Sequence, residues 1–90
     1  MNTDNQEQNE VTLKSLRESA ELTQPQLSRK LNVGIRIVSY WESGAKVPRF
    51  DHAIALAREL GVSLKTLAKS MQLDVDDVPD DRPLTSEDQE

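Results

Sequence analysis

Cysteine is absent from this chain of 90 residues, which also contains one histidine, His52, and three aromatic residues. Without thiols the chain forms neither a disulfide nor a thiolate zinc site, and one imidazole does not complete a metal site by itself. No nucleophile with a neighbouring base stands out in the sequence. We therefore expect no enzyme, and no bound metal or cofactor.

Long apolar runs are also missing. No stretch approaches the ~18 to 20 apolar residues of a membrane helix, and the polar start MNTDNQEQNE lacks the apolar segment of a secretory signal. We expect a cytoplasmic protein without a membrane segment. A chain of this length fits one small domain, which is marginal alone, so tight helix packing or self-association must stabilise it.

Charge is distributed unevenly along the chain, whose net charge is −5. Residues 12–73 contain ten lysines and arginines against five acidic residues, whereas residues 74–90 contain eight carboxylates and a single cation, Arg82. Residues 1–11 carry three further carboxylates. Both ends lack periodic apolar residues. We therefore predict a basic domain over 12–73 between two disordered acidic tails, 1–11 and 74–90.

Residues 12–73 have helical periodicity throughout, with no alternating pattern typical of strands. One face of a first helix is formed by Leu13, Leu16, Arg17 and Ala20. Thr23 and Gln26 have the spacing of a capping box at the start of a second helix, which ends near Leu31. Asn32 accepts the left-handed conformation that often terminates a helix.

Three further helices follow. The third is predicted over 35–43 and ends at Gly44, the fourth over 50–60 and ends at Gly61, and Ser63 caps a fifth. The inward positions of these helices are Val38, Trp41, Ala53, Leu56, Ala57, Leu60, Leu64, Leu67 and Met71. The fold class is therefore all-α, a compact domain of five helices.

Helices two and three, with a three-residue connection, have helix-turn-helix geometry. The stretch LKSLRESAELTQPQLSRKLNVGIRIVSYWESGAKVP, followed by LARELGVSL, resembles the phage-repressor (Cro/C1-type, Xre) helix-turn-helix family over about residues 12–69. The matching motifs are L-T-Q at the start of helix two, W-E-x-G at the end of helix three, and L-A-x-x-L-G-V in helix four. The resemblance implies a lambda-repressor-like fold that binds double-stranded DNA.

The resemblance also implies roles for single residues. Helix three lies in the major groove in this family, and its outward, base-reading positions correspond to Ile35, Arg36, Ser39 and Tyr40. Phosphate contacts correspond to Gln24, at the start of helix two, and to Lys46 and Arg49 in the loop after helix three. Arg17 and Glu42 match a structural ion pair of the family.

Each of these positions has a simpler interpretation beside the functional one. Arg36 is either a reader of guanine or a solvated surface arginine, and Tyr40 either contacts DNA or packs under the next loop. Ile35 contacts either a thymine methyl group or another subunit or loop. Ile37 is expected to pack against helix two, and His52 to face solvent.

The functional hypothesis is a transcriptional regulator, a small repressor that acts as a homodimer on a pseudo-palindromic operator. The resemblance places candidate dimer contacts at Leu67, Met71 and Leu73. An alternative is an antitoxin-like or adapter module that binds protein through the same fold. The acidic C-terminal tail has three interpretations: a solvating segment, a binding segment for a protein partner, or an inhibitor that competes with DNA.

Overall fold

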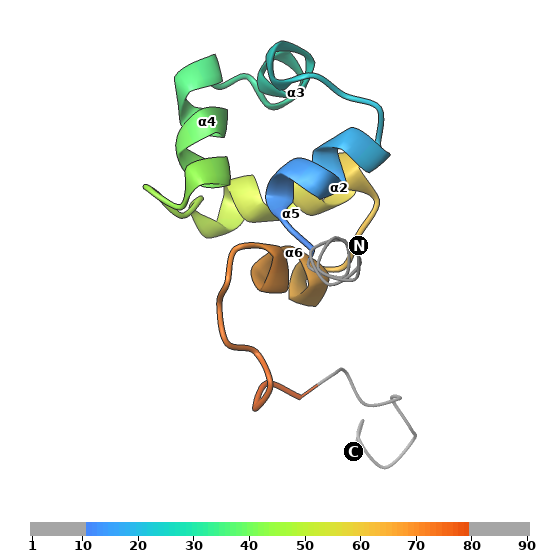
Figure 1. The fold of residues 1–90 in the computed structure, drawn as a ribbon, viewed down its shortest axis with the longest axis vertical. Coiled ribbons are helices and arrows are strands. Elements are labelled where there is room, and N and C mark those ends of the chain that lie inside the picture. Colours follow the sequence, from blue (N-terminus) through green and yellow to red (C-terminus); the bar gives the residue numbers. More distant parts are fainter. Residues whose placement is uncertain (1–10, 80–90) are drawn as a thin grey trace, which may run out of the picture.

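The structure, a computed structural model, describes residues 11–79 and contains no strand within them (Figure 1). Its helices, in chain order, are α2 (Leu13–Ser19), α3 (Gln24–Leu31), α4 (Ile35–Ser43), α5 (Phe50–Leu60) and α6 (Leu64–Ser70). The predicted all-α class with five helices is confirmed. The predicted tails fall largely on residues 1–10 and 80–90, which lie outside the described residues. Within 11–79, no helix has the length and apolarity of a membrane span.

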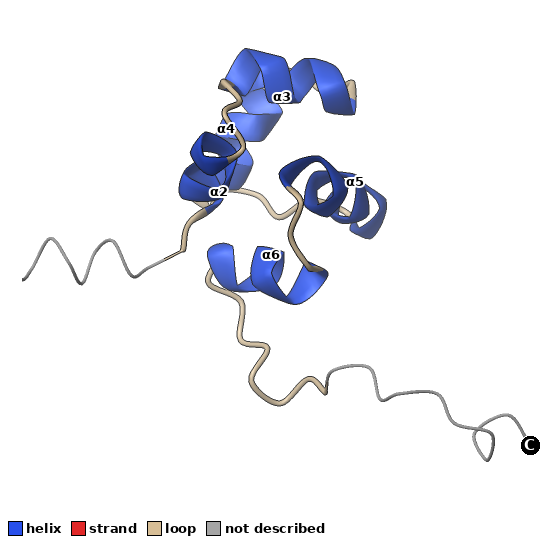
Figure 2. Cartoon of the chain, turned by 90° about the vertical axis from the view of Figure 1, so that its right-hand side faces the viewer, coloured by secondary structure: helices blue, strands red, loops and turns tan. Residues whose placement is uncertain are grey.

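The helices form two packed groups that share α2 and α5. At one end α3 packs on α4 and α5, and α4 packs on α2; at the other end α6 packs on α5 and α2. Both views place α3 and α6 at opposite ends of the domain (Figures 1 and 2). The C-terminal segment leaves the domain beside α6. It therefore starts at the end of the domain opposite α3.

Local sequence signals explain the ends of α3 and α4. The Thr23 hydroxyl accepts a hydrogen bond from the Gln26 amide at 3.2 Å, and the Thr23 amide donates to Gln26 Oε1 at 2.8 Å, which confirms the capping box. Asn32 has φ 58° and ψ 46°, the left-handed conformation expected of it. Gly44, at φ 86°, ends α4, where a side chain would be strained.

A second capping box was not predicted. The Ser15 amide donates to Thr12 Oγ1 at 3.0 Å, and the Thr12 amide donates to Ser15 Oγ at 2.9 Å, at the start of α2. The usual motif has Glu or Gln at the third helical position, so a serine there was not recognised as a cap. The shorter serine side chain accepts the same hydrogen bond from the N-cap amide that a glutamate or glutamine usually accepts.

The core lies between the five helices. Its buried apolar residues are Leu13, Leu27, Val38, Trp41, Leu56, Ala57, Leu60 and Leu67. Burial of one such large side chain stabilises a fold by about 1.5 to 3 kcal/mol. Two buried serines are satisfied by the preceding turn, since Ser28 donates to the Pro25 carbonyl at 2.8 Å and Ser70 to the Leu67 carbonyl at 2.6 Å.

One predicted core position is wrong. Leu64 is 40% exposed, although the helical pattern placed it on the inner face of α6. It is the first residue of that helix, where no preceding turn covers it, and it lines the edge of an apolar groove. Ala53 and Met71 are half-buried and pack against the core, as expected.

Candidate nucleic-acid interface

Helix α4 has one face in the core and one face in solvent. Val38 and Trp41 are buried, with exposed fractions of 0% and 4%. On the other side, Ile35, Arg36 and Ser39 are all exposed. Ser39 lies four residues after Ile35 and three after Arg36, so it neighbours both side chains on one face of the first two turns. The structure therefore brings three of the four predicted base-reading residues together.

Tyr40, the fourth, lies at the edge of that face. It is half-buried, and its ring is covered by the loop after α4, because Lys46 Nζ lies 5.3 Å from the ring centroid. The Lys46 amide also donates to the Tyr40 carbonyl at 3.3 Å. Lys46 is therefore held beside the exposed face of α4.

A buried polar network fixes α4 to the rest of the domain. Arg17 Nε lies 2.5 Å from Glu42 Oε2, and both side chains are at most 10% exposed. Arg17 also donates from Nη1 to the Leu22 carbonyl at 2.8 Å. Gln24 Nε2 donates to Glu42 Oε1 at 2.9 Å. The hydrogen bond to Glu42 raises the pKa of Arg17 further above its ordinary value, with burial acting in the opposite direction.

This network joins three helices at one carboxylate. Arg17 belongs to α2, Gln24 to the first turn of α3, and Glu42 to the last turn of α4. Charged hydrogen bonds that are shielded from water have strict geometry, and removal of one partner destabilises the fold strongly because the other charge is left buried and unpaired. The arrangement therefore sets the angle at which α4 presents its exposed face.

Arg49 lies apart from this network. It is the N-cap residue of α5, and its Nη2 lies 3.1 Å from Asp51 Oδ2 in a pair whose side chains are both more than 60% exposed. The backbone amide of His52 donates to Asp51 and is the main cause that lowers the pKa of that carboxyl. Such an exposed pair contributes little to stability and leaves the guanidinium accessible.

The surroundings of two further side chains, His52 and Ile37, were also predicted from the sequence. The prediction that His52 faces solvent is wrong: it is half-buried, and its ring centroid lies 5.6 Å from that of Trp41 at an interplanar angle of 51°. Position 52 is in the first turn of α5, where its ring meets Trp41 of α4. Ile37 is half-buried and packs against the core.

Two contacts of the site could not be read from the chain. The contact between Tyr40 and Lys46 depends on the path of an irregular loop, and such a loop has no periodic sequence pattern from which its path could be predicted. The bond from Gln24 to Glu42 joins residues 18 positions apart. Only the L-T-Q motif around Gln24 marked that position at all.

Comparison with known proteins identifies the fold family. A family model described as helix-turn-helix (HTH_3) matches residues 13–67, more than half of the chain. Searches of curated proteins and of solved structures gave no match. The matched region contains the α3–α4 pair, the buried network and the exposed face of α4. The chain belongs to the Cro/C1-type helix-turn-helix family of DNA-binding transcription regulators.

Proposed function

We propose that the protein is a sequence-specific repressor that binds a pseudo-palindromic operator as a homodimer. The observation that carries this proposal is the exposed face of α4, which offers a guanidinium, a hydroxyl and an apolar side chain on a helix held by buried charged hydrogen bonds. A rigid helix with mixed chemistry on its outer face suits the major groove, where each base pair presents its own pattern of donors, acceptors and methyl groups.

The roles on this face follow from chemistry. The Arg36 guanidinium donates two parallel hydrogen bonds to guanine O6 and N7, and the Ser39 hydroxyl donates to or accepts from a neighbouring base edge. Ile35, which is 49% exposed, contacts a thymine methyl group. A good bidentate pair is worth about 1 to 3 kcal/mol of discrimination against the wrong base.

Phosphate contacts surround the face. A glutamine amide nitrogen carries two N–H donors, and Gln24 uses one of them for Glu42. We assign the second to a phosphate beside the start of α3. Lys46 and Arg49 are exposed and supply cations from the loop after α4 and the start of α5. These contacts position the domain and contribute the salt dependence of binding.

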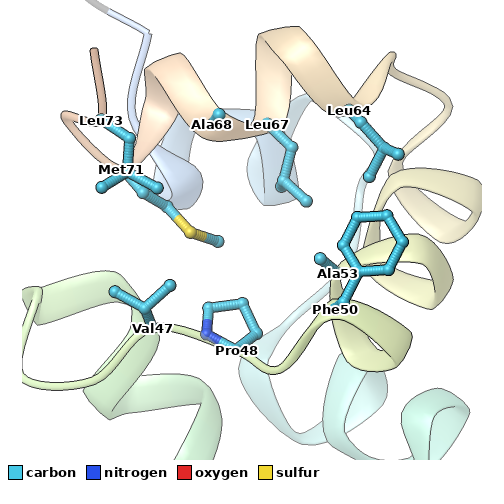
Figure 3. A pocket seen from close by; sticks show the side chains of 9 residues that line it. All are labelled: Val47, Pro48, Phe50, Ala53, Leu64, Leu67, Ala68, Met71 and Leu73. Carbon is cyan, nitrogen blue, oxygen red and sulfur yellow. The ribbon is translucent and has the colours of Figure 1, made fainter. Parts of the chain in front are cut away.

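The face of self-association is an apolar groove between α6 and the segment that joins α4 to α5 (Figure 3). Phe50 is 71% exposed, Val47 58% and Leu73 43% at its edges. Leu67, predicted as a dimer contact, is 2% exposed and forms the floor, whereas Met71 is half-buried and Leu73 is exposed. Clusters of large exposed apolar side chains mark interfaces, and a second copy provides a second α4.

Light scattering of the purified protein tests this surface. We expect a dimer for the wild type and a folded monomer for Phe50→Ser, whose side chain contributes most of its area to solvent rather than to the core. Lys69→Ser, an exposed change at the end of α6, is the control and should stay dimeric. A wild type that is still monomeric at about 100 μM contradicts the dimer, because that concentration lies well above the dissociation constants of stable interfaces.

The reading face is tested by the double variant Arg36→Ala and Ser39→Ala. We expect it to lose sequence-specific affinity for a selected duplex while the thermal unfolding temperature stays within a few degrees of the wild type. The matched control is Arg58→Ala with Ser19→Ala, which removes one exposed arginine and one exposed serine from α5 and α2. Equal affinity of both double variants would exclude α4 as the reading helix.

A second candidate is protein binding through α4, in the manner of an antitoxin or an adapter. The exposed apolar side chain of Ile35 favours it, because apolar anchors are common at the centre of protein interfaces. Under this function the Arg36 and Ser39 double variant has no DNA affinity to lose, so the wild-type measurement alone separates the two candidates.

A further inference from the structure

The loop after α4 is folded back on the last turn of that helix. The Ser43 hydroxyl donates to the Tyr40 carbonyl at 3.2 Å and accepts from the Ala45 amide at 3.3 Å. The Lys46 amide donates to the same Tyr40 carbonyl at 3.3 Å. These three bonds fold residues 44–46 back against the C-terminal turn of α4, so the Lys46 side chain begins within reach of the Tyr40 ring.

The side chain of Lys46 then lies on the tyrosine ring. Its ammonium is 5.3 Å from the ring centroid, within the ~6 Å over which a cation is attracted to the negative face of an aromatic ring. The C-terminal end of α4, which is the negative end of the helix dipole, also favours a cation at this place. A lysine in a loop without such a partner samples many rotamers, and phosphate binding would have to order it.

We propose that Tyr40 is a positioning residue that holds the Lys46 ammonium beside the α4 face, ready to bind a DNA phosphate next to the bases read by Arg36. This inference rests on the proposed function, because it assigns a role within the same interface. It changes the role of Tyr40, whose ring face is occupied by the cation. The ring contributes through Lys46, and the two residues act as one unit.

A double-mutant cycle on DNA affinity tests the coupling. Lys46→Ala is expected to weaken binding and to lower the slope of log affinity against log salt by about one for each subunit that makes the phosphate contact, which is about two for the dimer. Tyr40→Leu is expected to weaken binding about two- to fivefold through the lost ring. In the Lys46→Ala background, Tyr40→Leu should cause no further loss. Tyr40→Phe keeps the ring and should bind DNA with the affinity and the salt slope of the wild type.

A second series removes dependence on the folding of Tyr40→Leu. Replacement of Tyr40 by phenylalanine, monofluorophenylalanine and trifluorophenylalanine preserves the shape of the ring while it reduces the negative charge of its face. We expect affinity to fall stepwise along this series with Lys46 present and to stay constant in the Lys46→Ala background. Unfolding monitored at Trp41 should show equal stability for all three.

The outcomes separate the two proposals. Wild-type protein that binds no duplex in a salt-sensitive way contradicts the proposed function itself. DNA binding in which the Tyr40 and Lys46 effects simply add, or in which the fluorinated series is flat, overturns the positioning role and leaves the function standing. A large loss with Tyr40→Phe also overturns it, because the hydroxyl would then be the contact.

Discussion

Removal of one partner from the Arg17–Glu42 pair should destabilise the domain severely. The two side chains are 10% and 8% exposed, so the remaining charge in Glu42→Ala stays almost without water. Arg17 would keep the Leu22 carbonyl as a partner, and Gln24 would lose its acceptor. Breaking a buried pair in this way costs about 3 to 5 kcal/mol. A domain of this size has about 3 to 10 kcal/mol in total.

The double variant Arg17→Met with Glu42→Leu should recover much of that loss. Apolar side chains of similar volume remove the unpaired charge, and such replacements are often neutral or stabilising. We therefore expect a coupling free energy of about 2 kcal/mol or more between the two positions. The helix angle would lose its charged anchor, so DNA affinity should fall in this variant even where stability returns.

Urea unfolding followed by Trp41 fluorescence measures these effects, because the single tryptophan is 4% exposed and lies in α4. With a slope of about 1 kcal/mol per molar urea, a loss of about 3 to 5 kcal/mol should lower the unfolding midpoint by about 3 to 5 M, or unfold the single variants in buffer if the wild type has no more than that. The control is Lys30→Ala, which breaks a 3.9 Å pair with Glu59 on the surface and should cost less than about 1 kcal/mol. A loss below 1 kcal/mol for Glu42→Ala would refute the anchoring role of the network.

Three further predictions concern local structure and pH. Thr23→Ala should cost about 1 kcal/mol in urea unfolding, because it removes the cap of α3; no change would mean that the capping box is inert. Gly44→Ala should lower the free energy of unfolding by about 1 to 2 kcal/mol, because a φ of 86° strains any side chain even where the space around it is open. Gly34→Ser, at φ −73°, should raise it by a few tenths of a kcal/mol, because serine is a better N-cap residue than glycine. Equal effects of the two substitutions would contradict this. The pKa of Asp51 is lowered, mainly by the His52 amide, so its contribution is present above about pH 4 and lost as pH falls through the lowered pKa. The free energy of unfolding of Asp51→Asn should therefore be lower than that of the wild type near neutral pH, and the two values should converge near pH 2. A difference that is the same at both pH values would contradict this.

The helices were predictable because their ends carry strong local signals. Thr23 with Gln26, and the glycines at 44 and 61, determine backbone geometry within a few residues of themselves. The apolar period then assigns the inner face, and it failed at Leu64, where the helix begins and a preceding turn is missing. Ser15 was missed because its role as a cap depends on a shorter side chain than the motif usually has.

The candidate site was predictable only in part. Ile35, Arg36 and Ser39 follow from helical spacing on a helix whose inner face is marked by Val38 and Trp41. The surroundings of Tyr40 depend on a loop that returns to its own helix, and those of His52 depend on how α5 packs beside Trp41. Such contacts are set by tertiary packing, on which the pattern of a single chain carries no information.

Selection of bound duplexes from a random pool tests the central claim most directly. We predict an enriched site with two-fold symmetry, whose half-sites lie about one helical turn, ~34 to 36 Å, apart. Affinity for that site should fall steeply with rising salt concentration. The Arg36→Ala variant should lose its preference for guanine at one position of each half-site. A pool that shows no enriched sequence, with wild-type protein confirmed as folded, would contradict sequence-specific DNA binding.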